Sequence, residues 1–205
     1  MNGLVWKDAT LLRNGLIYVA AFGVVFSLLF SESNVMGIVC PMLFSSLVAS
    51  SFAWDDQCKW DVYAVSTGIP RNRIVLSKYL SSVVFITIGF AIGLVVSVAM
   101  PSVTGADTDL ASTIIVSVTG WVLSAIVVSI SITVNYWTGS SVKAQYVSIV
   151  VLMASIAFLV SATIIASDLV GGNMLLVTGI LLVIAALMFA GTYRVSCARF
   201  SKRDL

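Results

Sequence analysis

Histidine is absent from the 205-residue sequence, and charged residues make up only 10% of it. The lack of histidine excludes Ser–His and Cys–His catalytic pairs and histidine-ligated zinc. Three cysteines are present, at positions 40, 58 and 197. Their odd number and irregular spacing predict free, packed thiols rather than a disulfide framework or a metal site.

Most of the sequence is apolar. They make up 60% of the chain, and the mean hydropathy is +1.08. This surplus predicts a membrane protein whose apolar surface faces lipid. The net charge of +2 is too small to indicate a nucleic-acid partner. No small-residue cleavage site clearly follows the first apolar run, so we expect no signal peptide.

Six apolar segments are each long enough to cross a bilayer as a helix, which takes roughly 20 residues. They predict an all-α polytopic protein with a single transmembrane domain over residues 1–205. The predicted spans are 14–31, 35–53, 79–100, 111–134, 144–167 and 173–193.

Basic residues all fall on one side of this six-span arrangement, whereas acidic residues occur on both sides. By the positive-inside rule, the basic side and both termini are cytoplasmic. The bases are Lys7, Arg13, Lys59, Arg71, Arg73, Lys78, Lys143, Arg194, Arg199, Lys202 and Arg203.

None of the six spans contains Asp, Glu, Lys or Arg. An ionisable group within a span usually marks a proton or ion path, so proton-coupled transport and ion pumping are disfavoured. A membrane enzyme is disfavoured because it would need acids, bases or metal ligands at its site. A phosphate-binding G-x-x-x-x-G-K-[ST] motif is also missing; TGSSVK at 138–143 is only a fragment of it. Energy for transport would therefore come from a separate partner.

The longest polar stretch of the chain is the loop WDDQCKWDVYAVSTGIPRNRIVLSKY at 54–79. Placed on a helix, residues 55–67 show two apolar faces separated by charge, which suits a helix packed on the spans and fitted into a partner's groove. Gly68 is expected to end this helix, and Pro70 to begin the next. One face carries Trp60, Tyr63, Ala64 and Thr67, and the other carries Cys58, Val62 and Val65.

Three smaller features flank this loop. Arg71 and Arg73 sit where a helix dipole disfavours them, so they are expected to anchor to lipid phosphates or an acidic partner. In the 135–143 loop, Tyr136, Trp137 and Lys143 are either interfacial belt residues or a second partner contact. Residues 2–15 predict an in-plane amphipathic elbow helix. For the 54–79 loop itself, a solvated loop with interfacial aromatics remains the alternative.

Two motifs resemble small permeases of the ABC-2 type. The first is LVWKDATLLR at 4–13. The second is DDQCKWDVY…IPRNRIVLSKY, which covers Asp55, Asp56, Lys59, Trp60, Asp61, Tyr63, Pro70, Arg73, Val75, Lys78 and Tyr79. STGIPRNR departs from the family's usual S-L-P-V-S-R before the third span. Within this family, the sequence also resembles the bacterial exporters of phenol-soluble modulins.

This resemblance implies a permease subunit of an ATP-driven exporter in the bacterial cytoplasmic membrane, moving amphipathic or antimicrobial-type peptides. Two copies would pair in the lipid membrane, each docking a separate ATP-binding subunit that holds ATP and Mg, with no cofactor in this chain. The coupling helix between spans 2 and 3 would dock through Asp55, Asp56, Lys59, Trp60, Asp61, Tyr63, Arg71 and Arg73. The alternative is a non-transport assembly or sensor subunit whose loop binds a regulator.

Overall fold

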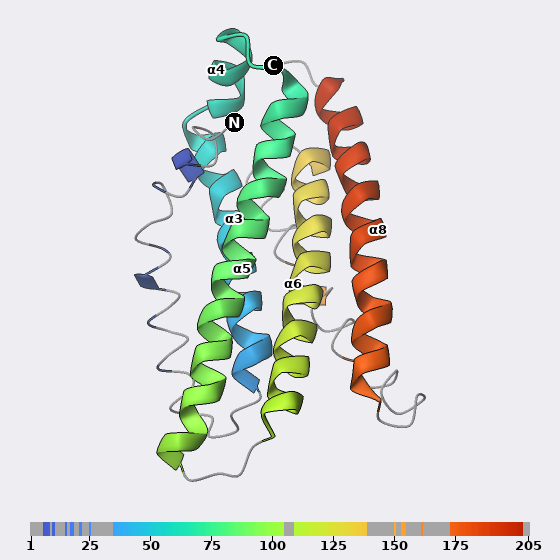
Figure 1. The fold of residues 1–205 in the computed structure, drawn as a ribbon. Coiled ribbons are helices and arrows are strands. Elements are labelled where there is room, and N and C mark those ends of the chain that lie inside the picture. The colour runs from blue at the N-terminus through green and yellow to red at the C-terminus, as the bar shows by residue number, and fades with distance from the viewer. Residues whose placement is uncertain are drawn as a thin grey trace.

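The computed structural model describes residues 6–8, 10, 15, 17–18, 21, 25, 35–104, 109–138, 150, 153–154, 161 and 173–202. Within them the chain is helical and contains no strand. The long helices are α3 (Val35–Gln57), α5 (Arg71–Thr104), α6 (Leu110–Thr138) and α8 (Met174–Ser201), and the short helix α4 (Trp60–Ser66) joins α3 to α5. The long helices form a bundle with α4 at one end (Figure 1).

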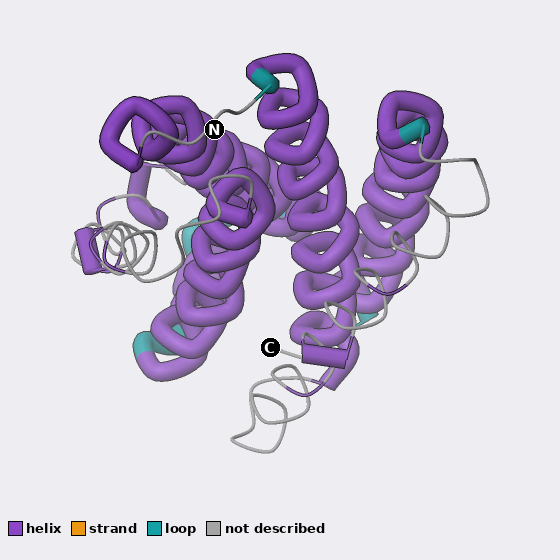
Figure 2. Tube along the Cα trace, turned by 90° about the horizontal axis from the view of Figure 1, so that it is seen from below, coloured by secondary structure: helices purple, strands orange, loops and turns teal. Residues whose placement is uncertain are grey.

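Cross-contacts fix the direction of each helix in this bundle. Gly37 at the start of α3 lies against Ser117 near the start of α6. Thr119 of α6 is hydrogen-bonded to Thr178 near the start of α8, at 2.6 Å between hydroxyl oxygens. The helices α3, α6 and α8 therefore run the same way. Gly93, in the second half of α5, lies against Met36 at the start of α3, so α5 runs against them. Figure 2 shows these helices from below, looking along the bundle.

Small residues set the closest approach between helices. A Cβ added at Gly120 of α6 would lie 2.5 Å from the carbonyl oxygen of Gly37 and 2.6 Å from Cα of Ile38. A Cβ at Gly93 of α5 would lie 2.9 Å from the carbonyl oxygen of Met36. Helices in a membrane associate through such close backbone contact, because lipid offers them no hydrophobic drive.

Four of the six predicted spans coincide with helices long and apolar enough to cross a membrane: Met36–Gln57, Arg71–Ala99, Leu110–Thr138 and Met174–Ser201. The predicted spans 14–31 and 144–167 lie outside the described residues, apart from isolated positions. Most of the predicted elbow lies outside them too, although Trp6, Lys7, Asp8 and Thr10 are helical. The six-span count stays a prediction.

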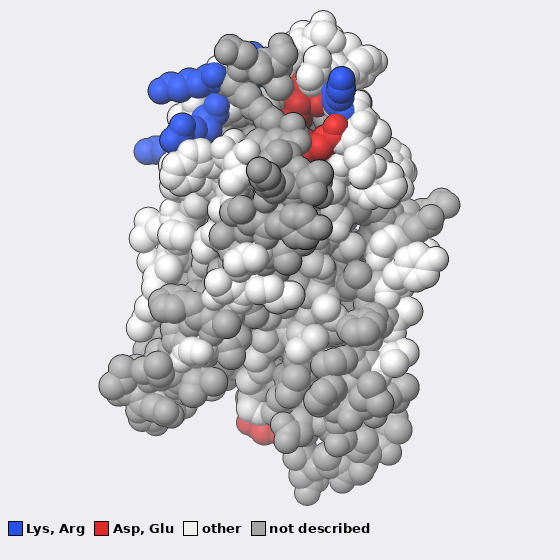
Figure 3. Space-filling model, turned by 180° about the vertical axis from the view of Figure 1, so that it is seen from behind, with Lys and Arg blue, Asp and Glu red and all other residues white. Residues whose placement is uncertain are grey.

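Charge is confined to the ends of the bundle. The described Lys and Arg residues all lie at the α4 end, and on the face drawn in Figure 3 they gather there, while the described side chains visible in the middle are uncharged. At the opposite end, the Asp109 carboxylate accepts a hydrogen bond from the Ala111 amide at 3.2 Å, at the start of α6. The described bases thus lie together at one end of the folded bundle.

Candidate functional site

Four charged side chains meet at the α4 end, between α3, α5 and the segment Trp6–Asp8. The Lys7 ammonium lies 2.6 Å from Asp55 Oδ1 and 3.3 Å from Asp8 Oδ1. The Lys78 ammonium lies 3.1 Å from Asp8 Oδ1 and 2.5 Å from Asp55 Oδ2. Each lysine therefore contacts both aspartates in a closed ring, which we call the charge cluster.

The charge cluster is almost fully removed from solvent. The side chains of Asp8, Lys78 and Asp55 are 2%, 4% and 7% exposed, and that of Lys7 is 22% exposed. Burying single charges is costly, and the cost is recovered only where geometry is good and the remaining polar atoms are bonded. Two positive and two negative charges cancel here, so the cluster buries no net charge.

Hydroxyl groups add hydrogen bonds to the charge cluster. Lys78 donates to the Ser51 hydroxyl at 3.0 Å, and the Ser81 hydroxyl donates to Asp8 Oδ2 at 3.0 Å. Ser51 belongs to α3 and Ser81 to α5, so the cluster ties these two helices and the segment Trp6–Asp8 into one unit. Both serines are buried, so these hydrogen bonds are shielded from water.

Aromatic rings cover the two lysines. The Lys7 ammonium lies 4.3 Å from the ring centroid of Trp60, the first residue of α4. The Lys78 ammonium lies 5.2 Å from the ring centroid of Phe52 on α3. Cation–π contacts of this kind strengthen when they are desolvated. Trp60 thereby connects α4 directly to the charge cluster.

The predicted continuous helix over 55–67 is wrong. Helix α3 ends at Gln57, and α4 begins at Trp60. Between them Lys59 adopts a left-handed conformation with φ of 49°, which breaks the helix. The apolar face predicted for an unbroken helix therefore does not include Cys58, which lies between the two helices. The predicted stop at Gly68 is confirmed by its φ of 81°, and α5 begins directly after Pro70.

Helix α4 turns one side to the protein and another outward. Ala64 is fully buried, and Trp60 and Val65 pack against the core at this end of the bundle. Val62 and Tyr63 are 45% and 58% exposed. Exposed large apolar groups that lie together are typical of an interaction site. Val62 and Tyr63 form the outer face of α4.

The predicted docking residues separate into distinct places. Asp55 lies in the charge cluster, Trp60 covers it, and Lys59 and Tyr63 are exposed. Asp56 and Asp61 are half-buried and have interaction partners. The structure therefore brings only part of the predicted set to the surface.

The two predicted anchoring arginines differ. Arg71 donates from Nη1 to the carbonyl oxygens of Ser201 at 2.6 Å and Phe200 at 3.3 Å. These carbonyls belong to the C-terminal end of α8, where backbone acceptors are unpaired and the helix dipole is negative. Arg71 thus binds within the chain. Arg73 is exposed.

The second predicted contact is divided in a similar way. Tyr136 is buried, with ring centroids 5.3 Å from those of Phe52 and Phe200. Trp137 is 66% exposed and stacks on the Arg199 guanidinium at 5.0 Å. Lys143 lies outside the described residues. Trp137 can therefore be either an interfacial belt residue or a partner contact, whereas Tyr136 is part of the core.

Sequence reasoning did not assemble the charge cluster. Lys7, Asp8 and Lys78 were quoted within the two family motifs, but nothing paired them with Asp55. The available signal was that each motif carries lysine and aspartate near the cytoplasmic end of a predicted span. Their separations of 48 and 70 residues hid the pairing.

The four long described helices are apolar enough to cross a membrane and carry charged residues only near their ends, as expected of a polytopic membrane protein. The family model described as ABC-2 family transporter protein matches residues 3–200. The chain belongs to this family, and it is a permease subunit of an ABC transporter; such permeases normally work with an ATP-binding subunit. No curated protein and no solved structure matches the chain.

Proposed function

We propose that this permease exports amphipathic, antimicrobial-type peptides from a bacterial cell, driven by a separate ATP-binding subunit that docks on α4. The observation that carries the docking role is the position of α4. Its outer face exposes Val62 and Tyr63, and its first residue, Trp60, lies on the charge cluster. A partner bound outside would therefore act on a residue connected to two long helices.

The proposed complex contains two copies of the chain and two ATP-binding subunits, with ATP and Mg held by the latter. The α4 end would be cytoplasmic, in the cytoplasmic membrane. The confinement of the described bases to that end supports this orientation, since cytoplasmic segments are enriched in Lys and Arg.

The proposed mechanism is mechanical. Closure of the ATP-binding subunits would push α4, and the Trp60 ring would pass the displacement to Lys7. Because Lys7 is paired with Asp55 of α3, and Lys78 of α5 pairs with the same carboxylate, both helices would move with the segment Trp6–Asp8. A rigid cluster suits this purpose, since packed elements shift between discrete arrangements rather than deforming continuously.

The peptide cargo is inferred from the resemblance and from the uncharged middle of the described helices. A path between such helices would accept an amphipathic segment without ionic contacts. The alternative is an assembly or sensor subunit, in which the same outer face of α4 would bind a regulator and no partner ATPase would be stimulated.

The test is co-purification of the tagged chain, expressed with its chromosomal neighbours, from mild detergent, followed by an ATPase assay. We expect an ATPase to co-purify at one copy per permease. Tyr63→Ala should reduce the bound ATPase about tenfold or more, as loss of an interfacial aromatic hot spot typically does. Leu175→Ala is the matched control, because Leu175 is a similarly exposed apolar residue at the opposite end.

Trp60→Ala separates docking from coupling. We expect this variant to retain more of the ATPase than Tyr63→Ala does, while ATP hydrolysis no longer responds to cargo peptide. A chain that purifies alone and inert from several mild detergents would favour the sensor alternative. Unchanged docking and unchanged transport in both variants would remove the role proposed for α4.

A further inference from the structure

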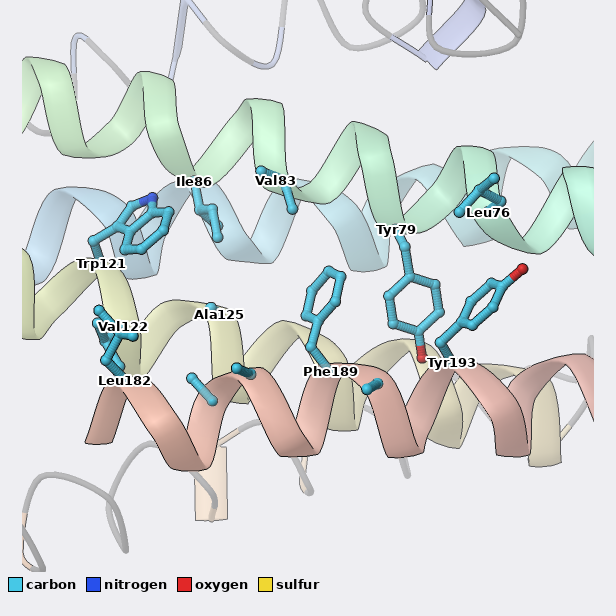
Figure 4. A pocket seen from close by; sticks show the side chains of 13 residues that line it. Leu76, Tyr79, Val83, Ile86, Trp121, Val122, Ala125, Leu182, Phe189 and Tyr193 are labelled. Carbon is cyan, nitrogen blue, oxygen red and sulfur yellow. The ribbon is translucent and has the colours of Figure 1, made fainter. Parts of the chain in front are cut away.

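The bundle also contains a cavity between α5, α6 and α8, separate from the charge cluster and from the outer face of α4. Its volume is about 580 Å³, within the usual range for a ligand site. Among the described residues its wall is almost entirely apolar (Figure 4). We call this cavity the slot.

Small residues on α8 hollow out the slot. Ala185, Ala186 and Ala190 face it, with Phe189 between them, and Trp121 of α6 lies toward its far end. Ala186 and Ala190 remain exposed. The slot is therefore open on the α8 side, and the described side chains leave its space unfilled.

The length of the slot matches one leaflet of a bilayer. On α5 its lining runs from Leu76 to Ile86, which at 1.5 Å per residue is about 15 Å. On α8 it runs from Leu182 to Tyr193, again about 16 Å at the same rise. The hydrocarbon core of a bilayer is about 30 Å thick, so one leaflet contributes about 15 Å. The slot thus spans the depth of one acyl chain.

The end of the slot nearest α4 has the polarity of a membrane interface. Tyr79 and Tyr193 lie there. The Tyr79 hydroxyl is buried and bonded to that of Ser196, whereas the half-buried Tyr193 points its hydroxyl toward the Leu76 end (Figure 4). A tyrosine placed like Tyr193 is typical of the level of lipid headgroups. One turn before Leu76 on the same side of α5 is Arg73, which is exposed and forms no ion pair with any residue that the structure describes.

We propose that the slot holds one acyl chain of an anionic phospholipid from the leaflet at the α4 end, with its phosphate bound by Arg73. The apolar wall accepts the chain, the depth matches one leaflet, and the unpaired guanidinium supplies the complementary charge. The site does not depend on the identity of the cargo or on docking of an ATPase.

The test measures binding of phosphatidylglycerol and phosphatidylcholine to the purified full-length chain by native mass spectrometry, with thermal melting in neutral detergent alongside. We expect one phosphatidylglycerol retained per chain and a higher melting temperature with it than with phosphatidylcholine. Arg73→Gln should lower the preference for phosphatidylglycerol about fivefold, the contribution of one base near an anionic surface. Lys202→Gln, an exposed base at the same end, should leave the preference unchanged.

Blocking the slot is the second arm. Ala186→Phe places a ring in the open space and should abolish retention of both lipids, whereas Leu187→Phe, at a 70% exposed neighbour that does not line the slot, should not. Ala190→Leu repeats the block should Ala186→Phe fail to fold. Inorganic phosphate alone should produce no thermal shift.

Three results would overturn the proposal. The first is equal retention of both lipids by the unaltered chain. The second is unchanged retention in Ala186→Phe and Ala190→Leu. The third is a concentration-dependent dimer that these variants abolish while lipid retention persists, which would assign the slot to a second copy of the chain.

Discussion

Helix α6 contacts α3 on one side and α8 on the other, and the two contacts are built differently. Toward α3, Gly120 approaches Gly37 so closely that no Cβ fits. Toward α8, side chains make the contact, as in the Thr119–Thr178 hydrogen bond and the Trp137–Arg199 stack. A Cβ added at Gly179 or Gly191 of α8 would meet nothing within 4 Å among the described residues.

Burial follows the same division. In their most apolar 18-residue windows, α6 buries 61% of its residues and α8 only 11%. The charge cluster then ties α5 to α3 at the α4 end. The difference indicates that α6 lies inside the bundle and α8 at its edge, where it packs on α6 but leaves most of its surface, and the slot beside it, open. A displacement delivered through α4 would reach α3 and α5 first, because the charge cluster connects them.

The largest effect is expected where this difference is greatest. Gly120→Leu forces a side chain against the Gly37 carbonyl oxygen and the Ile38 Cα, so α3 and α6 must separate. Overpacking of this type costs about 1–3 kcal/mol and sometimes more. We expect a loss of monodisperse protein in size-exclusion chromatography and a large drop in melting temperature.

Gly179→Leu is the matched control, since it makes the same exchange on a helix where the added side chain meets open space. We expect its melting temperature to stay near that of the unaltered chain. Equal losses in the two variants would show that α8 is packed as tightly as α3, and the division of the bundle would have to be abandoned.

The next effect concerns the charge cluster. Lys78→Met leaves two buried aspartates facing one lysine, and breaking a buried ion pair in this way costs about 3–5 kcal/mol. Part of this cost is avoided in a membrane protein if water reaches the end of the bundle. The free energy of unfolding in mixed micelles measures the loss, and Lys202→Met, an exposed base at the same end, is the control.

A double variant shows whether charge balance is the cause. Asp8→Asn together with Lys78→Met removes one charge of each sign and leaves Lys7 paired with Asp55. The double variant should therefore be more stable than the sum of the two single losses predicts. Simple additivity would mean that Lys78 stabilises the chain through its contacts with Ser51 and Phe52 rather than through charge balance with Asp8.

Hydropathy located four helices but not their ends at the α4 side. The second predicted span stopped at position 53, whereas α3 continues to Gln57. The third predicted span begins at position 79, inside a helix that starts at Arg71, as the stop at Gly68 and Pro70 predicted. Charged residues end a hydropathy window, but Asp55 of α3 and Lys78 of α5 pair with each other in the fold, so both helices extend beyond their apolar segments.

Features that depend on the backbone preference of a single residue could be predicted from the sequence. Features that depend on a residue far away in the chain could not. The stop at Gly68 and the start after Pro70 follow from backbone preferences and were predicted. The break at Lys59 was missed because a left-handed lysine has no strong sequence signal. Gly120 and Gly179 look alike in the sequence, and only the fold shows which of them meets a neighbouring helix.

The smallest expected effect tests how α8 is held. The Tyr79 hydroxyl of α5 lies 3.1 Å from the Ser196 hydroxyl of α8 and 3.4 Å from that of Thr133 on α6. Tyr79→Phe removes this bond but keeps the ring that packs edge-on against Phe189 at 4.9 Å. Side-chain hydrogen bonds between membrane helices contribute about 0.6 kcal/mol on average, so we expect a loss of that order in the free energy of unfolding.

A double-mutant cycle with Ser196→Ala isolates the bond from the other effects of each change. We expect a coupling energy of about 0.6 kcal/mol, because both single variants remove the same hydrogen bond. A coupling several times larger would mean that the hydroxyl bridge, rather than apolar contact, holds α8 on the bundle. The lateral position of α8 would then be as firmly specified as the α3–α6 contact, and the slot beside it would have a rigid wall.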